Sequence, residues 1–171
     1  MNRRNIVSLS VLTFVGAALL HGSAVAQQKS FKDLFVGNWT LVSAITTNAD
    51  GSKFFPFGEK PSGALINEEN GHFVSLNINA LPKIASGNRL TATADENKAI
   101  VQGVLGQIGT WSIDDASKTF VQHVNSATFA NWDGTDQKKI IDKLTEDELV
   151  YENPAPTTGA GSTILSYRRE K

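Results

Sequence analysis

Residues 35–42 read Phe-Val-Gly-Asn-Trp-Thr-Leu-Val and open a chain that otherwise consists of strand-like runs. Gly37 allows the backbone to turn tightly into the first strand, because glycine has no Cβ atom to restrict its φ angle. The indole of Trp39, two residues later, is large enough to plug one end of a closed sheet. We therefore interpret this stretch as the start of a barrel whose closed end lies at Trp39.

Turn-forming sequences divide the rest of the chain into strand-like runs. Asn70-Gly71 separates two such runs, and Asn-Gly in this setting is the strongest short hairpin signal. The predicted strands are Leu41–Thr47, Gly63–Asn67, His72–Asn79, Gln107–Ile113, Lys118–Asn125, Asp136–Leu144, Glu148–Asn153 and Ser162–Arg169. A barrel of about eight strands has an interior that just holds one small ligand. The sequence therefore predicts an all-β fold, an eight-stranded antiparallel up-and-down barrel.

Two segments depart from this pattern of strands. Thr93–Leu105 is predicted to form one short helix, because Thr93 and Glu96 have the spacing of a capping box and an apolar stripe follows them. Phe54–Gly58 is an aromatic loop in which Pro56 interrupts any strand pairing. A loop rarely buries three phenylalanines together, so this loop is either a hydrophobic lid over the mouth of the barrel or packs on the barrel end.

Residues 1–26 have the pattern of a signal peptide that is cleaved after Ala26. Two arginines precede an apolar run from Ile6 to Leu20, which is shorter than the roughly 20 residues that a membrane span needs. Removing these 26 from the 171 residues leaves 145, Gln27–Lys171, a length that suits one domain. We therefore expect an exported protein, periplasmic or secreted, without a stable membrane anchor.

The composition argues against several classes of function. Without the two leader arginines, 14 of the 16 basic residues remain against 17 acidic ones, which gives a net charge of −3. No basic patch remains to bind a phosphate backbone, so nucleic acid is not an expected partner. The chain has no cysteine, and only two of its three histidines remain after cleavage. Thiolate nucleophiles and zinc sites with several imidazoles are therefore not expected, and we predict neither a metal nor a cofactor.

Several motifs follow one another along the chain in the order of a known family. They are Gly37-Asn38-Trp39-Thr40-Leu41-Val42, Phe55-Pro56-Phe57-Gly58, Pro61-Ser62-Gly63, Ala85-Ser86-Gly87-Asn88-Arg89-Leu90, Gly109-Thr110-Trp111, His123, residues 129–137 and Leu165-Ser166-Tyr167-Arg168-Arg169. From Gly37 to Arg169 the chain resembles the bacterial lipocalin-like domain family, whose members are mostly uncharacterised, often exported and built of one domain. Asp133 departs from this pattern, since an apolar or small residue is expected there. The resemblance implies an up-and-down barrel with a central cavity, and it implies no established reaction.

The resemblance also implies a partner for the first-strand indole. In closed lipocalin barrels a basic residue of the last strand packs across this indole, and a guanidinium over an aromatic face gains roughly 0.5–2 kcal/mol. Arg168 or Arg169 is the candidate to cover Trp39, and we assign Arg168 to the structural motif together with Gly37 and Trp39. The alternative is that either arginine simply lies on the surface.

His123 is the most suggestive polar residue of the predicted barrel. It shares one face of a predicted strand with Val121 and Asn125, because alternate strand residues point the same way. If this face points inward, an imidazole and an amide enter the cavity together, where they orient a ligand carbonyl or carboxylate, or move a proton. Otherwise the imidazole nitrogens of His123 form hydrogen bonds with neighbouring side chains inside a barrel that is filled. An error of one residue in the register inverts every such assignment.

The remaining residues of the predicted ligand site are aromatic or lie in the polar segment before the sixth strand. They are Trp111, Asn131, Trp132, Tyr151, Phe55 and Phe57. Most aromatic residues of a small barrel fill its interior, and two or three of them are expected to line a cavity. Asn131 and Trp132 either belong to an ordinary strand connection or line the mouth. A calcium loop there is the weaker reading, because the alternating carboxylates and the distal glutamate are missing.

Three functions remain open from the sequence. The first is an exported lipocalin-like protein that binds a small hydrophobic or amphipathic ligand in the barrel cavity. The second is an isomerase or cyclase that acts on a small apolar substrate in the same cavity, with His123 as general acid and base. The third is a filled barrel whose exposed loops bind another protein.

Overall fold

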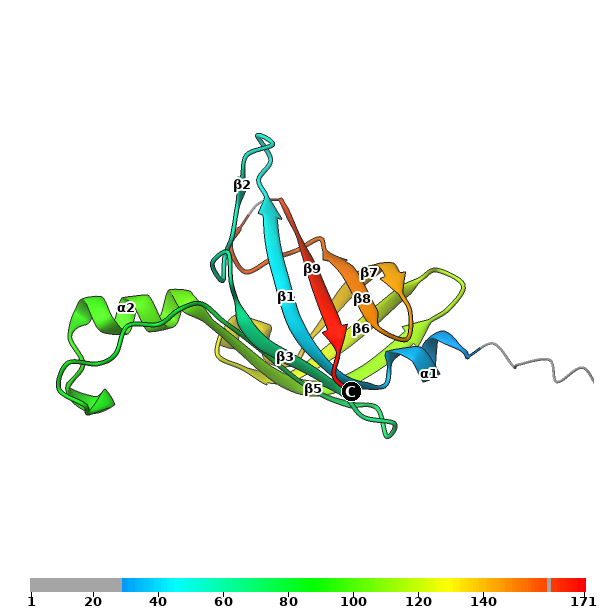
Figure 1. Ribbon diagram of the computed structural model, residues 1–171, viewed down its shortest axis with the longest axis horizontal. Coiled ribbons are helices and arrows are strands. Elements are labelled where there is room, and N and C mark those ends of the chain that lie inside the picture. The colour runs from blue at the N-terminus through cyan, green and yellow to red at the C-terminus, as the bar shows by residue number, and fades with distance from the viewer. Residues whose placement is uncertain (1–28, 160) are drawn as a thin grey trace, which may run out of the picture.

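The structure, a computed structural model, describes residues 29–159 and 161–171. Its main feature is an antiparallel sheet that closes on itself (Figure 1). The ring consists of β1 (Gly37–Thr47), β3 (Ser62–Asn67), β4 (His72–Ile78), β5 (Val104–Asp114), β6 (Thr119–Ala127), β7 (Thr135–Leu144), β8 (Glu148–Asn153) and β9 (Ser162–Arg169). The last strand, β9, pairs with β1 and so closes the barrel, while the two-residue β2 (Lys53–Phe54) pairs only with the end of β1. The predicted eight-stranded antiparallel barrel is confirmed.

Two strands begin at least three residues earlier than the sequence predicts. Strand β1 starts at Gly37 instead of Leu41, and β5 starts at Val104 instead of Gln107. Gly37 has a φ angle of +131°, a conformation that residues with a Cβ atom rarely adopt. A Cβ atom at this position would also collide with the guanidinium of Arg169. The tight start of the first strand therefore requires glycine.

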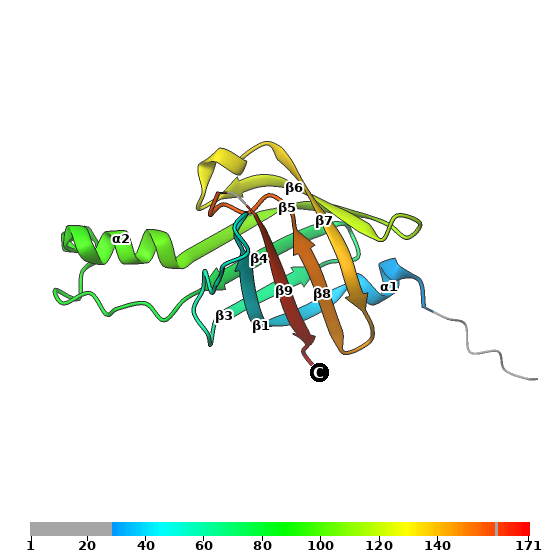
Figure 2. The same cartoon turned by 90° about the horizontal axis from the view of Figure 1, so that it is seen from above.

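The two α-helices lie at opposite ends of the barrel, as both views show (Figures 1 and 2). Helix α2 (Ala94–Gly103) was predicted, and both hydrogen bonds of the Thr93–Glu96 capping box are formed. It ends two residues before the predicted Leu105, because Val104 already has extended backbone angles. Helix α1 (Phe31–Phe35) was not predicted. Two 3₁₀ turns, η1 (Arg89–Thr91) and η2 (Ala130–Trp132), complete the regular structure.

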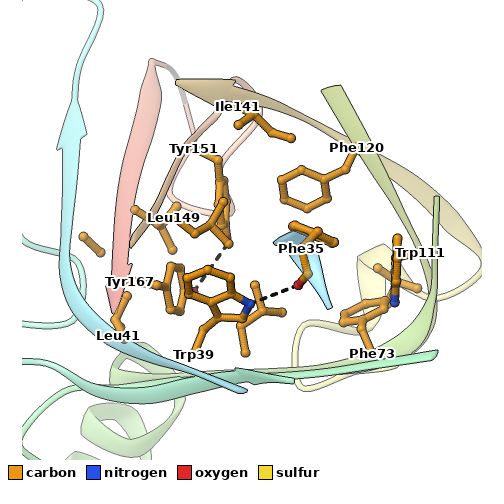
Figure 3. Packing of buried hydrophobic residues seen from close by; sticks show 14 of the residues in the cluster. Phe35, Trp39, Leu41, Phe73, Trp111, Phe120, Ile141, Leu149, Tyr151 and Tyr167 are labelled. Atoms are coloured by element: carbon orange, nitrogen blue, oxygen red, sulfur yellow. Dashed lines mark hydrogen bonds between the residues drawn. The ribbon is translucent and has the colours of Figure 1, made fainter. Parts of the chain in front are cut away.

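Helix α1 closes one end of the barrel by inserting Phe35 among the aromatic side chains of the strands (Figure 3). Its ring centroid lies 5.0 Å from that of Trp111 and 4.7 Å from that of Phe120. Trp39 is completely buried, and its indole N–H donates a hydrogen bond of 3.0 Å to the carbonyl oxygen of Phe35. Phe35 and Trp39 together fill the closed end, so any opening of the barrel lies at the other end.

The arginine that covers Trp39 is Arg169, and the assignment of this role to Arg168 is wrong. The guanidinium carbon of Arg169 lies 4.0 Å from the centroid of the Trp39 ring, and its N–H groups donate to the carbonyl oxygens of Leu34, Val36 and Glu146. Arg168 is exposed, because the buried Tyr167 precedes it and adjacent residues of a strand point to opposite faces.

The predicted signal peptide, residues 1–26, lies outside the described residues. Among the described residues, neither helix has the length and apolar character that crossing a membrane requires.

Candidate functional site

In the part of the chain that the structure describes, large side chains fill much of the barrel, so the central cavity that the resemblance implies is small. Most of the large buried side chains are aromatic and meet at the closed end (Figure 3). The space that remains is a cavity of about 30 Å³ toward the opposite end. It suffices for about two water molecules, since one needs roughly 10–15 Å³ by this measure. Whole ligands of ordinary size therefore do not fit inside the closed barrel.

The wall of this cavity contains polar side chains from several strands. It includes Asn77, Gln107, Lys139, Asn153 and Thr163, all of which are buried. Each stands at an inward position of its strand. Apolar atoms of other side chains, among them Trp132, complete the wall. A buried polar group lowers the stability of the fold unless it has a partner, so this cluster indicates a purpose other than packing.

Lys139 is the most unusual member of the cluster. It is only 2% exposed, and its ammonium group donates a hydrogen bond of 2.9 Å to Oδ1 of Asn153. The same nitrogen lies 5.0 Å from the ring centroid of Trp132. Among the described residues, no carboxylate forms a salt bridge with it. Burial therefore lowers the pKa of Lys139 from 10.5 to about 7, because the charged form is poorly solvated there.

Two stacked tyrosines lie beside the polar cluster. The hydroxyl groups of Tyr151 and Tyr167 are 3.4 Å apart, and Tyr167 donates a hydrogen bond of 3.1 Å to Oδ1 of Asn77. Burial raises the pKa of Tyr167 to about 12 and that of Tyr151 well above its usual value of 10. Both phenols are therefore neutral near pH 7 and contribute dipoles, but no charge, to the cavity.

Several buried amide and hydroxyl atoms of the interior lack a hydrogen-bond partner among the described residues. They are Oδ1 of Asn67, Oγ of Ser75, Oε1 of Gln107 and both amide atoms of Gln122. Of these four residues, Gln107 lines the cavity. Each unpaired group costs roughly 1–3 kcal/mol unless a water or a ligand satisfies it. Gln107 is therefore the member of this set whose side-chain amide lies beside a molecule that enters the cavity.

A groove lined mainly by aliphatic and aromatic side chains, with Gln102 and three threonines among them, lies directly outside the cavity. It has a volume of about 470 Å³ and runs between α2, the start of β5, the aromatic loop and the segment before η2. Its lining includes Phe54, Val101, Val104 and Phe129. Phe57 and Leu105, with Pro56, Thr157 and Thr158, line both the groove and the cavity. These shared residues form the partition between a small polar chamber and a larger apolar surface.

His123 and Asn125 lie on the outside of the barrel, and the expectation that they enter its interior is wrong. Both are exposed, while Phe120, Gln122 and Val124, which alternate with them along β6, are buried. The face with Phe120, Gln122 and Val124 carries two apolar side chains and the face with Val121, His123 and Asn125 only one, so the apolar pattern already favoured the face that is buried. Nδ1 of His123 lies 2.7 Å from Oδ1 of Asp136 across the exposed β6–β7 pair. His123 therefore cannot act as a general acid or base inside the barrel.

The other predicted site residues are divided between the cavity and other places. Trp132, Tyr151 and Phe57 line the cavity. Trp111 lies at the closed end against Phe35, where its indole donates to the carbonyl oxygen of Glu68. Asn131 is exposed, and Phe55 is 44% exposed at the tip of the aromatic loop. The side chains of Trp111, Asn131 and Phe55 therefore do not line the cavity.

Sequence reasoning missed Lys139, Gln107 and Asn153. Lys139 follows Lys138, and two adjacent lysines suggest a solvated strand. The available signal was the alternation in β7, where Gln137, Lys139 and Ile141 share one face and Ile141 is buried. Within the described residues, no three His, Cys, Asp or Glu side chains gather as a metal site would require.

The position of His123 leads to a simple test. Replacing His123 by Ala should change the free energy of unfolding by less than about 0.5 kcal/mol, because exposed ion pairs contribute little. It should also leave binding of any ligand at the open end unchanged. Urea denaturation and titration calorimetry of the variant measure both effects. A clear loss of ligand binding would contradict the outward orientation of β6 residue 123.

One family model and several solved structures match this chain. Residues 36–167 match the family described as the lipocalin-like domain. A lipocalin-like protein from Bacteroides uniformis has a similar structure, with 13% sequence identity, a TM-score of 0.43, and coverage of 80% of this chain and 99% of that one. A redesigned β-barrel is similar over 84% of this chain and all of its own, at 9% identity and a TM-score of 0.44. No curated protein matches the sequence.

Proposed function

Because this chain belongs to the lipocalin-like domain family, we propose that it is an exported protein that binds a small amphipathic molecule at the open end of its barrel. The observation that carries the proposal is the small polar chamber beside a larger apolar groove. The leader-like residues 1–26 support the export part of the proposal.

The dimensions of the two spaces support a ligand with two unlike parts. The chamber of about 30 Å³ accepts a head group of only a few atoms. The groove of about 470 Å³ has the size of common ligand pockets and accepts an apolar tail. The ligand passes the partition at Phe57 and Leu105, which both spaces share.

The two alternative functions have less support. An isomerase or cyclase that uses His123 inside the cavity is inconsistent with the outward position of this residue. A filled barrel that binds another protein through its loops explains neither the buried polar cluster nor the groove beside it. Binding of another protein through the loops remains the alternative function if no small amphipathic molecule binds.

The groove provides a direct test with an uncharged probe, 1-decanol. Val101 on α2 lines the groove and is 76% exposed, so Val101→Glu should place a carboxylate where the tail lies without disturbing the core. We expect the variant to bind 1-decanol about tenfold more weakly, because the apolar tail loses its contact with one aliphatic side chain of the groove. Titration calorimetry at pH 7 measures the dissociation constants.

Leu90→Glu is the matched control for this experiment. Leu90 is also an exposed aliphatic residue, at 84%, and it does not line the groove. Its replacement should leave the affinity for 1-decanol unchanged. Equal losses in the two variants would show that charge in general, and not the groove, determines the result.

A further inference from the structure

We propose that the polar end of the ligand is a carboxylate and that Lys139 is the group that pairs with it. The inference rests on the proposed function, since it concerns the head group of the same amphipathic ligand. It implies that the open end of the barrel recognises anionic molecules that carry a single apolar tail.

The first support is the position of the Lys139 ammonium group in the cavity wall. One of its three N–H donors is used by Oδ1 of Asn153, at 2.9 Å. The face of Trp132, with its centroid at 5.0 Å, provides an electrostatic contact that favours the cation. At least one donor therefore remains for a molecule in the cavity.

The second support is the set of charges around the cavity. Asn153 and Tyr151 come from β8, Phe120 pairs with Lys139 from β6, and Trp132 comes from η2. Tyr151 is the titratable residue of this group, and it is neutral near pH 7. The segment Pro156–Thr158 adds no charge. A buried ammonium without a counter-ion lacks the pairing that buried charges normally have, and a carboxylate in the cavity supplies it.

The third support is Gln107, which is 6% exposed and lines the same cavity with an unpaired Oε1 atom. The amide nitrogen of the same side chain carries two N–H donors. A carboxylate then accepts from both Lys139 and Gln107. With one cation and a volume of about 30 Å³, the cavity suits a single carboxylate better than a larger dianion such as phosphate.

This pairing makes ligand binding depend on pH. Burial lowers the pKa of Lys139 to about 7 in the empty site. A carboxylate beside it favours the ammonium form, so the complex retains a proton that the free protein loses above pH 7. Binding of a carboxylate must therefore weaken as the pH rises from 7 toward 9, while binding of an uncharged analogue with the same tail stays constant.

The experiment compares decanoate with 1-decanol by titration calorimetry, at pH 6.5 and at pH 9. The full set is measured for the unmodified protein, for Lys139→Met, and for Lys138→Met as the control at the exposed neighbouring position. We expect the unmodified protein and Lys138→Met to bind decanoate at least tenfold more tightly than 1-decanol at pH 6.5. This preference should disappear at pH 9, and it should be absent from Lys139→Met at both pH values.

The outcomes separate the two proposals. If neither compound binds the unmodified protein, the proposed function itself fails. If 1-decanol binds as tightly as decanoate at pH 6.5, or if Lys139→Met keeps the preference for decanoate, the carboxylate assignment is overturned and the proposed function stands. Circular dichroism verifies that Lys139→Met is folded. The pH dependence of the unmodified protein tests the assignment without any substitution.

Discussion

Replacing Arg169 by Ala is expected to lower the free energy of unfolding by about 2–4 kcal/mol, because it removes a cation–π contact and charged hydrogen bonds together. The guanidinium covers the Trp39 ring at 4.0 Å and donates to the carbonyl oxygens of Leu34, Val36 and Glu146. Two of these carbonyls belong to the end of α1 and the residue after it. The side chain therefore fixes the helix that plugs the closed end.

Arg168→Ala is the matched control, because Arg168 is the exposed neighbour of Arg169 on the same strand. Its loss should change stability by less than about 0.5 kcal/mol, as is usual for surface substitutions. Urea denaturation, followed by tryptophan fluorescence, measures both variants. If the two substitutions cost the same, Arg169 does not hold the closed end in the way that its contacts indicate.

Replacing Lys139 by Met is expected to stabilise the protein by about 2 kcal/mol at pH 6, although it removes the proposed ligand anchor. Exchanging a buried ion for an apolar residue of similar volume is often neutral or stabilising by about 1–4 kcal/mol. The hydrogen bond to Asn153 and the contact with Trp132 are lost, which reduces the gain. A binding site that costs stability is a common feature of functional positions.

The same substitution should remove a pH dependence of stability. The pKa of Lys139 is about 7 in the folded protein and 10.5 in the unfolded chain. Between these values the unfolded chain binds more protons, so the stability of the unmodified protein rises with pH. The full rise is on the order of 5 kcal/mol, given 1.36 kcal/mol for each tenfold change in proton affinity. Lys139→Met should show a flat profile in this range.

The pH range of this measurement is limited by the buried tyrosines. The pKa values of Tyr151 and Tyr167 are raised on folding, so their contribution to stability is present below pH 10 and is lost as the pH rises further. Urea denaturation between pH 6 and pH 9.5 avoids this region. Lys138→Met is again the control, and it should retain the slope of the unmodified protein. The same slope in Lys139→Met would rule out the lysine as its source.

The strands and α2 were predictable because their signals are local. Turn residues such as Asn70-Gly71 bound the strands, and the Thr93–Glu96 capping box defines the start of α2. Helix α1 was not predicted from the sequence, because its five residues form little more than one turn and show almost no periodic pattern. Its role depends on Phe35 reaching the strands around it, which is a tertiary contact.

The site was less predictable, because it depends on which face of each strand points inward. In β6, Gln122 lies between the apolar Phe120 and Val124, whereas His123 lies between Val121 and the polar Asn125, so the face of Gln122 is the more apolar of the two. The sequence interpretation placed His123 inside the barrel because imidazoles so often bind ligands. The fold buries Gln122 instead. Lys139 was overlooked because a lysine in a strand is normally solvated, and only the closed barrel shows that its side chain lies inside.

The pairing of β1 with β9 determines when this barrel is completed. It joins Trp39 to Arg169 and Thr47 to Ser162, residues from the two ends of the described chain. Contacts of such long sequence separation form slowly, since a large loop must close before they are made. Until the last strand is synthesised, β1 and β8 each keep an unpaired edge, and Trp39 lacks its arginine cover. The nascent chain therefore cannot complete its barrel before the last strand emerges, a delay that suits the export we propose.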